Sequence, residues 1–318
     1  MEWVERCPIC GASDPHLIFQ VEDRLYKELN LGKGEVVNRV HQCPECGVGF
    51  LSPRFDQGEL LTLYDAWYES HPEMKSLNSS FSQRKIRAFR RYHMRKLRRL
   101  SPRKGRVLDV GCGGGLFLYL CQREGWEVHG VELSRKAVEF AVQLLGDKVK
   151  VGIFRETEYP VLYFDVISMF DYIEHTRTPL EDLIHARELL KRGGILIGTT
   201  PNWRSLQARW MGKEWVGIIS DHLFYYTPQS LRGVLRRAGF EVLEIEGAPL
   251  PSLKEILSTK VEVLKRRLQK GRGRGVGSSS AAARPALFVY GFLMELLDYF
   301  GTLMGQGNIL WFAARRPV

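Results

Sequence analysis

Short apolar runs alternate with segments of helical periodicity between residues 105 and 247. Such alternation is typical of parallel strands whose connecting helices cover both faces of one sheet. The predicted strands are Arg106–Val110, Glu127–Val131, Val149–Ile153, Phe164–Met169, Gly194–Thr199, Phe240–Ile245 and, near the end of the chain, Asn308–Arg315. The predicted helices are Gly115–Glu124, Ser134–Leu145, Thr178–Leu190 and Pro228–Ala238. The pattern therefore predicts an α/β fold.

The flanking segments follow other patterns and predict further regions. Residues 1–54 contain short β-like runs and four cysteines, and residues 55–104 carry apolar residues at helical spacing. Residues 248–306 interrupt the α/β pattern before the last strand. We therefore expect a small N-terminal module, a helical linker or cap, a main domain over residues 105–247 plus 307–318, and a helical insertion.

The composition is that of a globular protein, because 44% of the 318 residues are hydrophobic and 26% are charged. It excludes a wholly disordered, collagen-like or disulfide-scaffold chain. The net charge of +10 is concentrated in residues 84–106, with +12, and residues 254–284, with +7, so the remainder carries −9. An acidic body with two basic segments differs from a uniformly basic nucleic-acid-binding protein.

Two matching cysteine pairs predict a metal site. Cys7 and Cys10 lie in one C-P-x-C-G knuckle, and Cys43 and Cys46 lie in another. Four thiolates satisfy tetrahedral Zn²⁺. Two such pairs in one small region favour a closed structural zinc ribbon over a redox C-x-x-C pair.

A glycine loop follows the first predicted strand, in the sequence VLDVGCGGG at residues 107–115. Glycines let the backbone turn sharply and approach a ligand closely. The dinucleotide fingerprint G-x-G-x-x-G would need glycine where Leu116 stands, and no Lys-Ser/Thr pair follows as in an ATP-binding loop. Glu132 ends the next strand, 21 residues after Gly111, and can accept both hydroxyls of a ribose. The alternative is an acidic residue that stabilises a helix N-terminus.

With this loop, four further segments resemble the class I S-adenosylmethionine-dependent methyltransferases. They are GVELS (130–134), FDVISMFDYIEHTRTPL (164–180), LLKRGGILIGTTPN (189–202) and HLFYYTPQSLRGVLRRAGFEV (222–242). The resemblance implies a Rossmann-like sheet of seven strands with the last one antiparallel, S-adenosylmethionine as cofactor, and a loop near Phe154 beside its adenine. The implied cofactor-binding residues are Asp109, Gly111, Cys112, Gly113, Gly115, Glu132, Leu133, Met169 and Phe170.

Two narrower resemblances concern the acceptor side. The cysteine pattern resembles a bacterial group that includes sugar C-methyltransferases, in which the ribbon helps to form or cover the substrate pocket. The main domain also resembles ubiquinone-type O-methyltransferases, where residues matching Asp171, Glu174 and His175 are linked to a divalent metal. Consecutive Glu and His side chains on a helix face different ways, so a second metal stays an alternative at this point.

The candidate catalytic residues follow from the chemistry of methyl transfer. The reaction is an in-line displacement, and an oxygen or carbon acceptor must also lose a proton. His175, just past the fourth strand, and His222, before a helix at the pocket rim, are candidate bases. For each, the alternative is a structural histidine in a satisfied polar network. Tyr225 is the third candidate, from an aromatic group that either stacks on an acceptor or packs in a cap.

The insertion holds a basic segment at 254–274 and an apolar segment at 286–303. Glu295 and Asp298 disfavour a helix that spans a membrane. Residues 254–304 therefore either contact an anionic membrane surface or cover the active site. The opening segment is acidic and has no apolar core, so we expect no secretory signal and a location in the cytoplasm or at the inner face of the membrane.

Three functions are compatible with these features. The sequence favours methyl transfer to an oxygen or carbon of a small molecule, such as a glycan, lipid-linked or quinone-like intermediate. An RNA methyltransferase would use the zinc ribbon and the basic segments for phosphate contacts, but the acidic remainder makes nucleic acid the less favoured partner. A non-catalytic scaffold would need neither the intact glycine loop nor Glu132.

Overall fold

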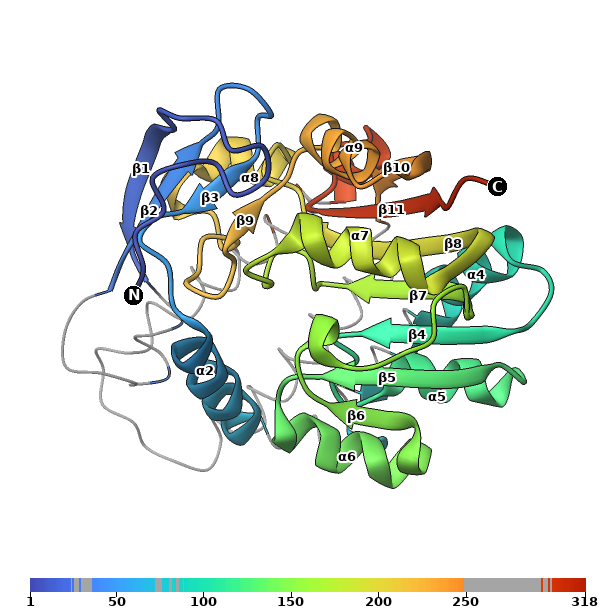
Figure 1. Cartoon of the computed structure of the whole chain (residues 1–318). Helices are drawn as coiled ribbons and strands as arrows, with labels where there is room; N and C mark the ends of the chain where they lie inside the picture. The colour runs from blue at the N-terminus through green and yellow to red at the C-terminus, as the bar shows by residue number, and fades with distance from the viewer. Residues whose placement is uncertain are drawn as a thin grey trace, which may run out of the picture.

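A seven-stranded sheet forms the centre of the protein (Figure 1). Its strands run in the order β10-β11-β8-β7-β4-β5-β6. The computed structural model describes residues 1–23, 25, 29, 36–71, 76–79, 82–83, 86–87, 89–248, 293, 297 and 299–318. The strands of this sheet are β4 Arg106–Val110, β5 Glu127–Glu132, β6 Val149–Val151, β7 Phe164–Phe170, β8 Leu190–Pro201, β10 Glu241–Gly247 and β11 Ile309–Arg315.

Strand directions in this sheet are those expected of the fold. β4 pairs in parallel with β5 and β7, and β7 in turn with β8. β11 is antiparallel to both of its neighbours, β8 and β10. The predicted α/β, Rossmann-like sheet of seven strands with an antiparallel last strand is therefore confirmed.

Helices cover both faces of the sheet. One core joins α7 and α9 to Leu108 and Ile167, and a second joins α4, α5 and α6 to Val107 and Val166. Successive side chains of a strand point to opposite faces, so the continuous apolar strands fill two cores. The helices are α2 Gln57–Ser70, α4 Met94–Leu100, α5 Leu116–Arg123, α6 Arg135–Leu145, α7 Pro179–Leu189, α8 Leu206–Met211 and α9 Pro228–Arg237.

A second sheet links the N-terminal module to the main domain. It has four antiparallel strands in the order β1-β2-β3-β9. Three come from the module, but β9 comes from the segment that follows β8 and α8. The module and the main domain therefore share a sheet, and the predicted boundary at residue 54 stays a prediction. The strands are β1 His16–Glu22, β2 Val37–Gln42, β3 Gly49–Leu51 and β9 Phe224–Tyr225.

Helix α2 stands at the end of the main sheet where the parallel strands terminate (Figure 1). A capping box begins it: Glu59 N donates to Asp56 Oδ1 at 2.9 Å, and Asp56 N donates to Glu59 Oε2 at 2.8 Å. Such reciprocal bonds satisfy backbone donors that a helix start leaves free. Ser134, at the start of α6, donates its hydroxyl to Asp65 at 2.8 Å and so ties α2 to the main domain.

The strands and helices predicted for the main domain are all present, with ends that differ by a few residues. The largest changes are in β6, which ends at Val151 because a short 3₁₀ turn begins at Phe154, and in β8, which already begins at Leu190. Most of the insertion, with its predicted segments at 254–274 and 286–303, lies outside the described residues, so the predicted membrane contact stays a prediction. Within the described ranges, no helix is long and apolar enough to cross a membrane.

Close packing between β8 and its neighbours generates a stability prediction. A Cβ on Gly198 would overlap the carbonyl oxygen of Met169 and the ring of Phe312. Gly198→Ala should therefore lower the free energy of unfolding by about 2 kcal/mol, as overpacking does. The matched control is Gly233→Ala on α9, where an added Cβ meets no described atom within 4 Å and alanine favours the helix by about 1 kcal/mol. Urea unfolding measures both, and equal effects would contradict the packing argument.

Candidate active site

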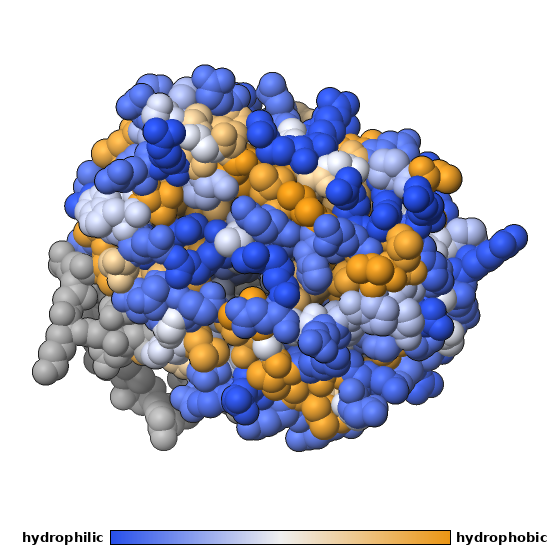
Figure 2. Space-filling view, in the orientation of Figure 1, coloured by the Kyte–Doolittle hydropathy of each residue, from blue (hydrophilic) through white to orange (hydrophobic). Residues whose placement is uncertain are grey.

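A cavity of about 600 Å³ lies at the carboxyl ends of β4, β5 and β7. Its described lining comes from α2, the glycine loop, the turn after β7 at residues 171–176, and the loop before β9 at residues 217–223. Open α/β sheets bind their ligands at this edge. On the face shown in Figure 2, hydrophilic residues dominate and hydrophobic residues gather in separate groups.

The glycine loop is shaped by residues with positive φ and by one carboxylate. Gly111 and Gly113 have φ of +70° and +51°, and a Cβ on Gly113 would lie 2.9 Å from the Tyr68 hydroxyl. Glu132, the last residue of β5, accepts from the backbone N–H of Gly113 at 2.8 Å and of Ser134 at 2.9 Å. The Glu132 carboxylate thus joins the loop to the start of α6. A carboxylate oxygen can accept more than one hydrogen bond, so this group can also accept from a ligand.

Buried carboxyl groups set the electrostatics at this end of the cavity. Ser168 donates to Asp109 at 2.7 Å, and burial raises the pKa of Asp109 to about 7. Burial also raises the pKa of Glu132, although backbone donors oppose the shift. Among the described lining residues, Arg177 is the single Lys or Arg. A cationic ligand would therefore find a site with little competing positive charge.

The predicted cofactor residues divide into those that line the cavity and those that support it. Gly115 and Met169 lie outside the lining: Gly115 packs against α6, and Met169 is fully buried in the core. Phe154 in the loop after β6 lines the cavity, at the place expected for an adenine neighbour. The predicted residues that do line it are Asp109, Gly111, Cys112, Gly113, Glu132, Leu133 and Phe170.

Both candidate histidines lie at the other end of the same cavity. His175 Nδ1 donates to the Asp221 carbonyl oxygen at 2.8 Å, and His222 Nδ1 donates to that of Gly217 at 2.8 Å. Their ring centroids are 4.8 Å apart. With Nδ1 protonated in each neutral ring, Nε2 is the nitrogen that can accept a proton. Burial, reinforced by His175, lowers the pKa of His222, which keeps it neutral near pH 7.

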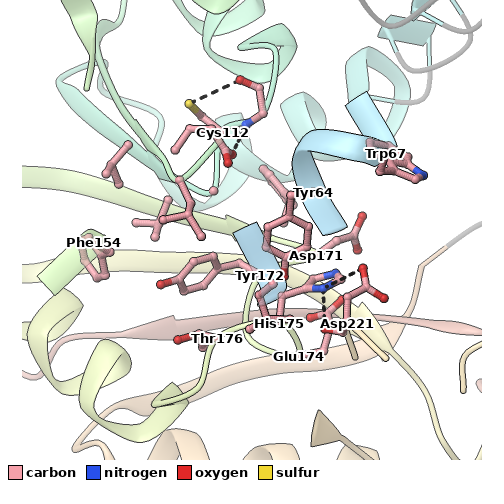
Figure 3. Close-up of a pocket in the computed structure, with 18 of the residues that line it drawn as sticks. Tyr64, Trp67, Cys112, Phe154, Asp171, Tyr172, Glu174, His175, Thr176 and Asp221 are labelled. Carbon is pink, nitrogen blue, oxygen red and sulfur yellow. Dashed lines mark hydrogen bonds and ion pairs between the residues drawn. The ribbon is translucent and has the colours of Figure 1, made fainter. Parts of the chain in front are cut away.

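Glu174 is a buried carboxyl group that lies close to His175 (Figure 3). Neither of its carboxylate oxygens has a hydrogen-bond partner among the described residues, and burial raises its pKa well above the ordinary range. Ligand atoms of Glu174, His175 and His222 all lie within 4.8 Å of one another. One carboxylate and two imidazoles suit a divalent cation. Residues 171–176 form a turn, so the helix-based argument against adjacent Glu and His ligands does not apply.

Two further predicted residues lie outside this three-residue cluster. They are Asp171, predicted as a ligand of the second metal, and Tyr225, the third candidate catalytic residue. Asp171 lines the cavity, but its carboxylate accepts from Thr199 at 2.8 Å and is not part of the three-residue cluster. Tyr225 lies in β9, where its side chain packs with Trp215 and Val40 in a core between the second sheet and α8. It does not line the described cavity.

Aromatic residues of α2 line the cavity and were not predicted as site residues. The Tyr64 ring lies edge-on to His175, with 6.0 Å between centroids, and its buried hydroxyl has no described partner (Figure 3). Trp67 and Tyr68 are the next aromatic positions of the same helix. Their spacing of three and four residues from Tyr64 was the available signal, because it places all three on one helix face.

The four N-terminal cysteines form a second candidate site. Cys7 Sγ lies 3.6 Å from Cys46 Sγ, and Cys10 Sγ lies 3.5 Å from Cys43 Sγ. All four sulfur atoms are mutually within 4.8 Å. A hydrogen bond from the Cys46 thiol lowers the pKa of Cys7 to about 5. The donor set and its spacing fit one tetrahedral thiolate-bound metal ion.

Comparison with known proteins identifies the family. A family model described as a methyltransferase domain matches residues 82–245, half of the chain. The chain therefore belongs to this methyltransferase family. The predicted class I S-adenosylmethionine-dependent methyltransferase domain is thereby confirmed, and S-adenosylmethionine is the cofactor that the family supports.

Individual relatives are similar over part of their length. The ubiquinone biosynthesis O-methyltransferase of Cereibacter sphaeroides (strain KD131 / KCTC 12085) is 33% identical over 155 residues, which cover 45% of this chain and 62% of that protein. The chain thus spans less than two thirds of that relative. The protein of the same name from Nitrosospira multiformis is 27% identical over 206 residues, covering 60% of this chain and 82% of the relative.

Solved structures share the fold. The [4+2]-cyclase SpnF has a TM-score of 0.52 at 20% identity, over 84% of this chain and 98% of its own. A Haemonchus contortus phosphoethanolamine N-methyltransferase 2 in complex with S-adenosyl-L-methionine has a TM-score of 0.53 at 19% identity, over 95% of this chain and 68% of its own. At these identities the likeness concerns the fold alone.

The raised pKa of Asp109 predicts a pH dependence of stability. An exposed aspartate in the unfolded chain has a pKa of about 3.9, so only the unfolded state ionises between that pH and about 7. The contribution of the neutral Asp109 side chain to the free energy of unfolding is therefore fully present below pH 4, and it is lost as the pH rises to 7. Relative to Asp109→Asn, the cofactor-free wild type should lose about 2 kcal/mol of unfolding free energy between pH 5 and pH 7. Urea unfolding at both pH values checks this, and parallel curves for the two proteins would refute it.

Proposed function

We propose that this protein transfers the methyl group of S-adenosylmethionine to a hydroxyl oxygen of a small molecule. The observation that carries the proposal is that one cavity joins the glycine loop and Glu132 to the pair His175 and His222. A cofactor at one end and a proton acceptor at the other is the arrangement that an in-line displacement on an acidic acceptor requires.

The cofactor end suits S-adenosylmethionine by shape and charge. The glycine loop lets the cofactor approach the backbone closely, and Glu132 has free lone pairs for the two ribose hydroxyls. The sulfonium and ammonium groups of the cofactor are cations, and Asp109 and Glu132 are carboxyl groups that burial makes costly to ionise alone. Binding of the cation would therefore favour the ionised carboxylates.

The acceptor end supplies bases and a place for a metal. His222, neutral near pH 7, can take the acceptor proton on Nε2, and His175 beside it is the alternative base. Alternatively, Glu174, His175 and His222 would hold a divalent cation, and a histidine whose Nε2 binds the metal cannot also take the acceptor proton. When bound, such an ion lowers the pKa of a coordinated hydroxyl. Tyr64 and Trp67 provide aromatic surfaces beside which a ring or sugar can lie.

The same bases could remove a proton from an acidic carbon, which is the second candidate acceptor. The resemblance of the four-cysteine module to that of sugar C-methyltransferases favours it. An RNA acceptor is disfavoured, because the cavity is lined by carboxyl groups and some cations of the basic segment 84–106 are already ion-paired. Lys96 contacts Glu244 at 3.1 Å, and Arg98 pairs with Glu124. Paired cations have little capacity left for phosphates.

We also propose that the four cysteines hold a structural Zn²⁺. The module has a small core, and a metal that crosslinks its two knuckles would stabilise it against unfolding. Burial of Cys7 and Cys43 in the core that continues to Leu231 of α9 connects this site to the main domain.

The central experiment separates cofactor binding from transfer. Wild type, Glu132→Gln and His222→Gln are titrated calorimetrically with S-adenosylmethionine. They are then assayed for release of S-adenosylhomocysteine with catechol as the oxygen acceptor and acetylacetone as the carbon acceptor. Glu132→Gln should weaken cofactor binding by about tenfold to a hundredfold, because a charged hydrogen-bond acceptor is lost. His222→Gln should bind the cofactor within about twofold of wild type but transfer methyl about a hundredfold more slowly.

The pH dependence of the transfer rate provides a further test. Transfer needs a neutral imidazole, so the rate should fall as the pH drops through the pKa of His222, which lies below the ordinary value of about 6.5. A wild type that does not bind S-adenosylmethionine would contradict the proposal. Full transfer activity in His222→Gln would remove this residue as the base and leave His175.

Removal of one cysteine tests the zinc proposal. Cys10→Ser should lower the zinc content by one ion per chain and lower Tm, because three thiolates no longer close the tetrahedral site. Elemental analysis and thermal unfolding measure both effects. The matched control is Cys121→Ala, a buried cysteine of α5 outside the cluster, which should leave the zinc content unchanged. Equal zinc contents in Cys10→Ser and wild type would overturn the assignment.

A further inference from the structure

We infer that two buried polar residues of the N-terminal module, Asp23 and Asn38, are positioning residues for the acceptor end of the active site. They hold the loop at residues 217–223, which carries the candidate base His222, against the turn that follows β7. The inference rests on the proposed function and gives the module a role beyond its metal site.

A closed network of hydrogen bonds joins the module to this loop. Asp23 directly follows β1, and Asn38 lies in β2, so one hairpin carries both. Asp23 Oδ2 accepts from Asn38 Nδ2 and from the backbone N–H of Ser220, each at 2.6 Å. Ser220 Oγ lies 3.3 Å from Asn38 Oδ1 and donates to it. All three residues are at most 3% exposed, so loss of one of them would remove hydrogen bonds between buried groups.

Further hydrogen bonds connect this loop to the candidate catalytic groups. Asp221 follows Ser220 directly, and its carbonyl oxygen accepts from His175 Nδ1 at 2.8 Å. Leu223 N then donates to the carbonyl oxygen of Glu174 at 2.7 Å. The loop is therefore bonded on one side to the module and on the other to the turn with the buried carboxylate. A shift of Ser220 would therefore displace His222, and the carbonyl group that accepts from His175 Nδ1, relative to Glu174.

The cofactor end is held by different contacts. Gly111 N donates to the Val131 carbonyl oxygen at 2.9 Å, and Gly113 N donates to Glu132 at 2.8 Å. These bonds belong to the main sheet and its own loop. Loosening the Asp23–Asn38–Ser220 network should therefore disturb the acceptor end and leave cofactor binding in place.

Amide hydrogen exchange, followed by mass spectrometry, measures this difference without an acceptor. In Asn38→Ala, peptides that cover residues 217–223 should exchange about tenfold faster, because the loop loses hydrogen-bond restraint. Peptides that cover the glycine loop should exchange as in wild type. The Kd for S-adenosylmethionine should stay within about twofold. Asp23→Asn, which keeps an oxygen for Ser220 N, is the milder variant if Asn38→Ala does not fold.

The matched control is Ser52→Ala. Ser52 is equally buried in the module, but its hydroxyl accepts from Val4 N at 2.9 Å and is not part of the Asp23–Asn38–Ser220 network. It should lower Tm without changing exchange in residues 217–223. Unchanged loop exchange in both network variants, or equal acceleration in Ser52→Ala, would overturn the inference, because the module would then act through global stability.

A kinetic arm separates this inference from the proposed function. If wild type methylates catechol, Asn38→Ala should raise KM for catechol at least fivefold more than KM for S-adenosylmethionine, on the order expected from loss of a positioning contact. An equal rise in both constants would count against positioning. If wild type methylates neither catechol nor acetylacetone, the proposed function is the part that fails, and the exchange data still decide whether the module restrains the loop.

Discussion

The pairing of β3 with β9 is the contact on which the active-site arrangement depends. Gly49 pairs with Tyr225 and Phe50 with Phe224, and Leu51 N adds a bond of 3.0 Å to the Leu223 carbonyl oxygen. A strand of two residues is not stable by itself. Here it is held because Phe50 and Phe224 are both about 1% exposed within one core. The loop before β9 lies beside the turn after β7, where Leu223 N donates to the Glu174 carbonyl oxygen, and the rings of His175 and His222 are 4.8 Å apart.

The burial of carboxyl groups is the second constraint. Asp109, Glu132 and Glu174 all line one cavity, and burial raises the pKa of each. A buried carboxylate is stable when it is protonated or when a cation lies beside it. S-adenosylmethionine carries cationic groups, and so would the divalent metal that we propose as an alternative at the other end of this cavity. We therefore expect this cavity to favour a cationic ligand, and binding of such a ligand to release protons.

The main domain and its cofactor end were predictable because their signals are local. The β4 strand, the glycine loop and Glu132 lie within 27 residues, and each part has a recognisable pattern of its own. The apolar runs of the parallel strands are continuous because both faces are buried, which makes them easy to recognise. The second sheet gives a weaker signal. Its last strand, Phe224–Tyr225, exists only because a partner about 175 residues earlier in the chain pairs with it.

At the acceptor end, the sequence predicted most of the residues but not their arrangement. The reason is again that the arrangement depends on contacts between distant parts of the chain. Helix geometry argued against adjacent ligands at Glu174 and His175, yet the segment is a turn, and the third member of the cluster, His222, comes from another loop. Tyr225 has the residue type of a catalytic group, but strand pairing directs its side chain into a core. Residue type and spacing along the chain thus identify groups that can do chemistry. Which of them share a cavity depends on long-range contacts such as the pairing of β3 with β9.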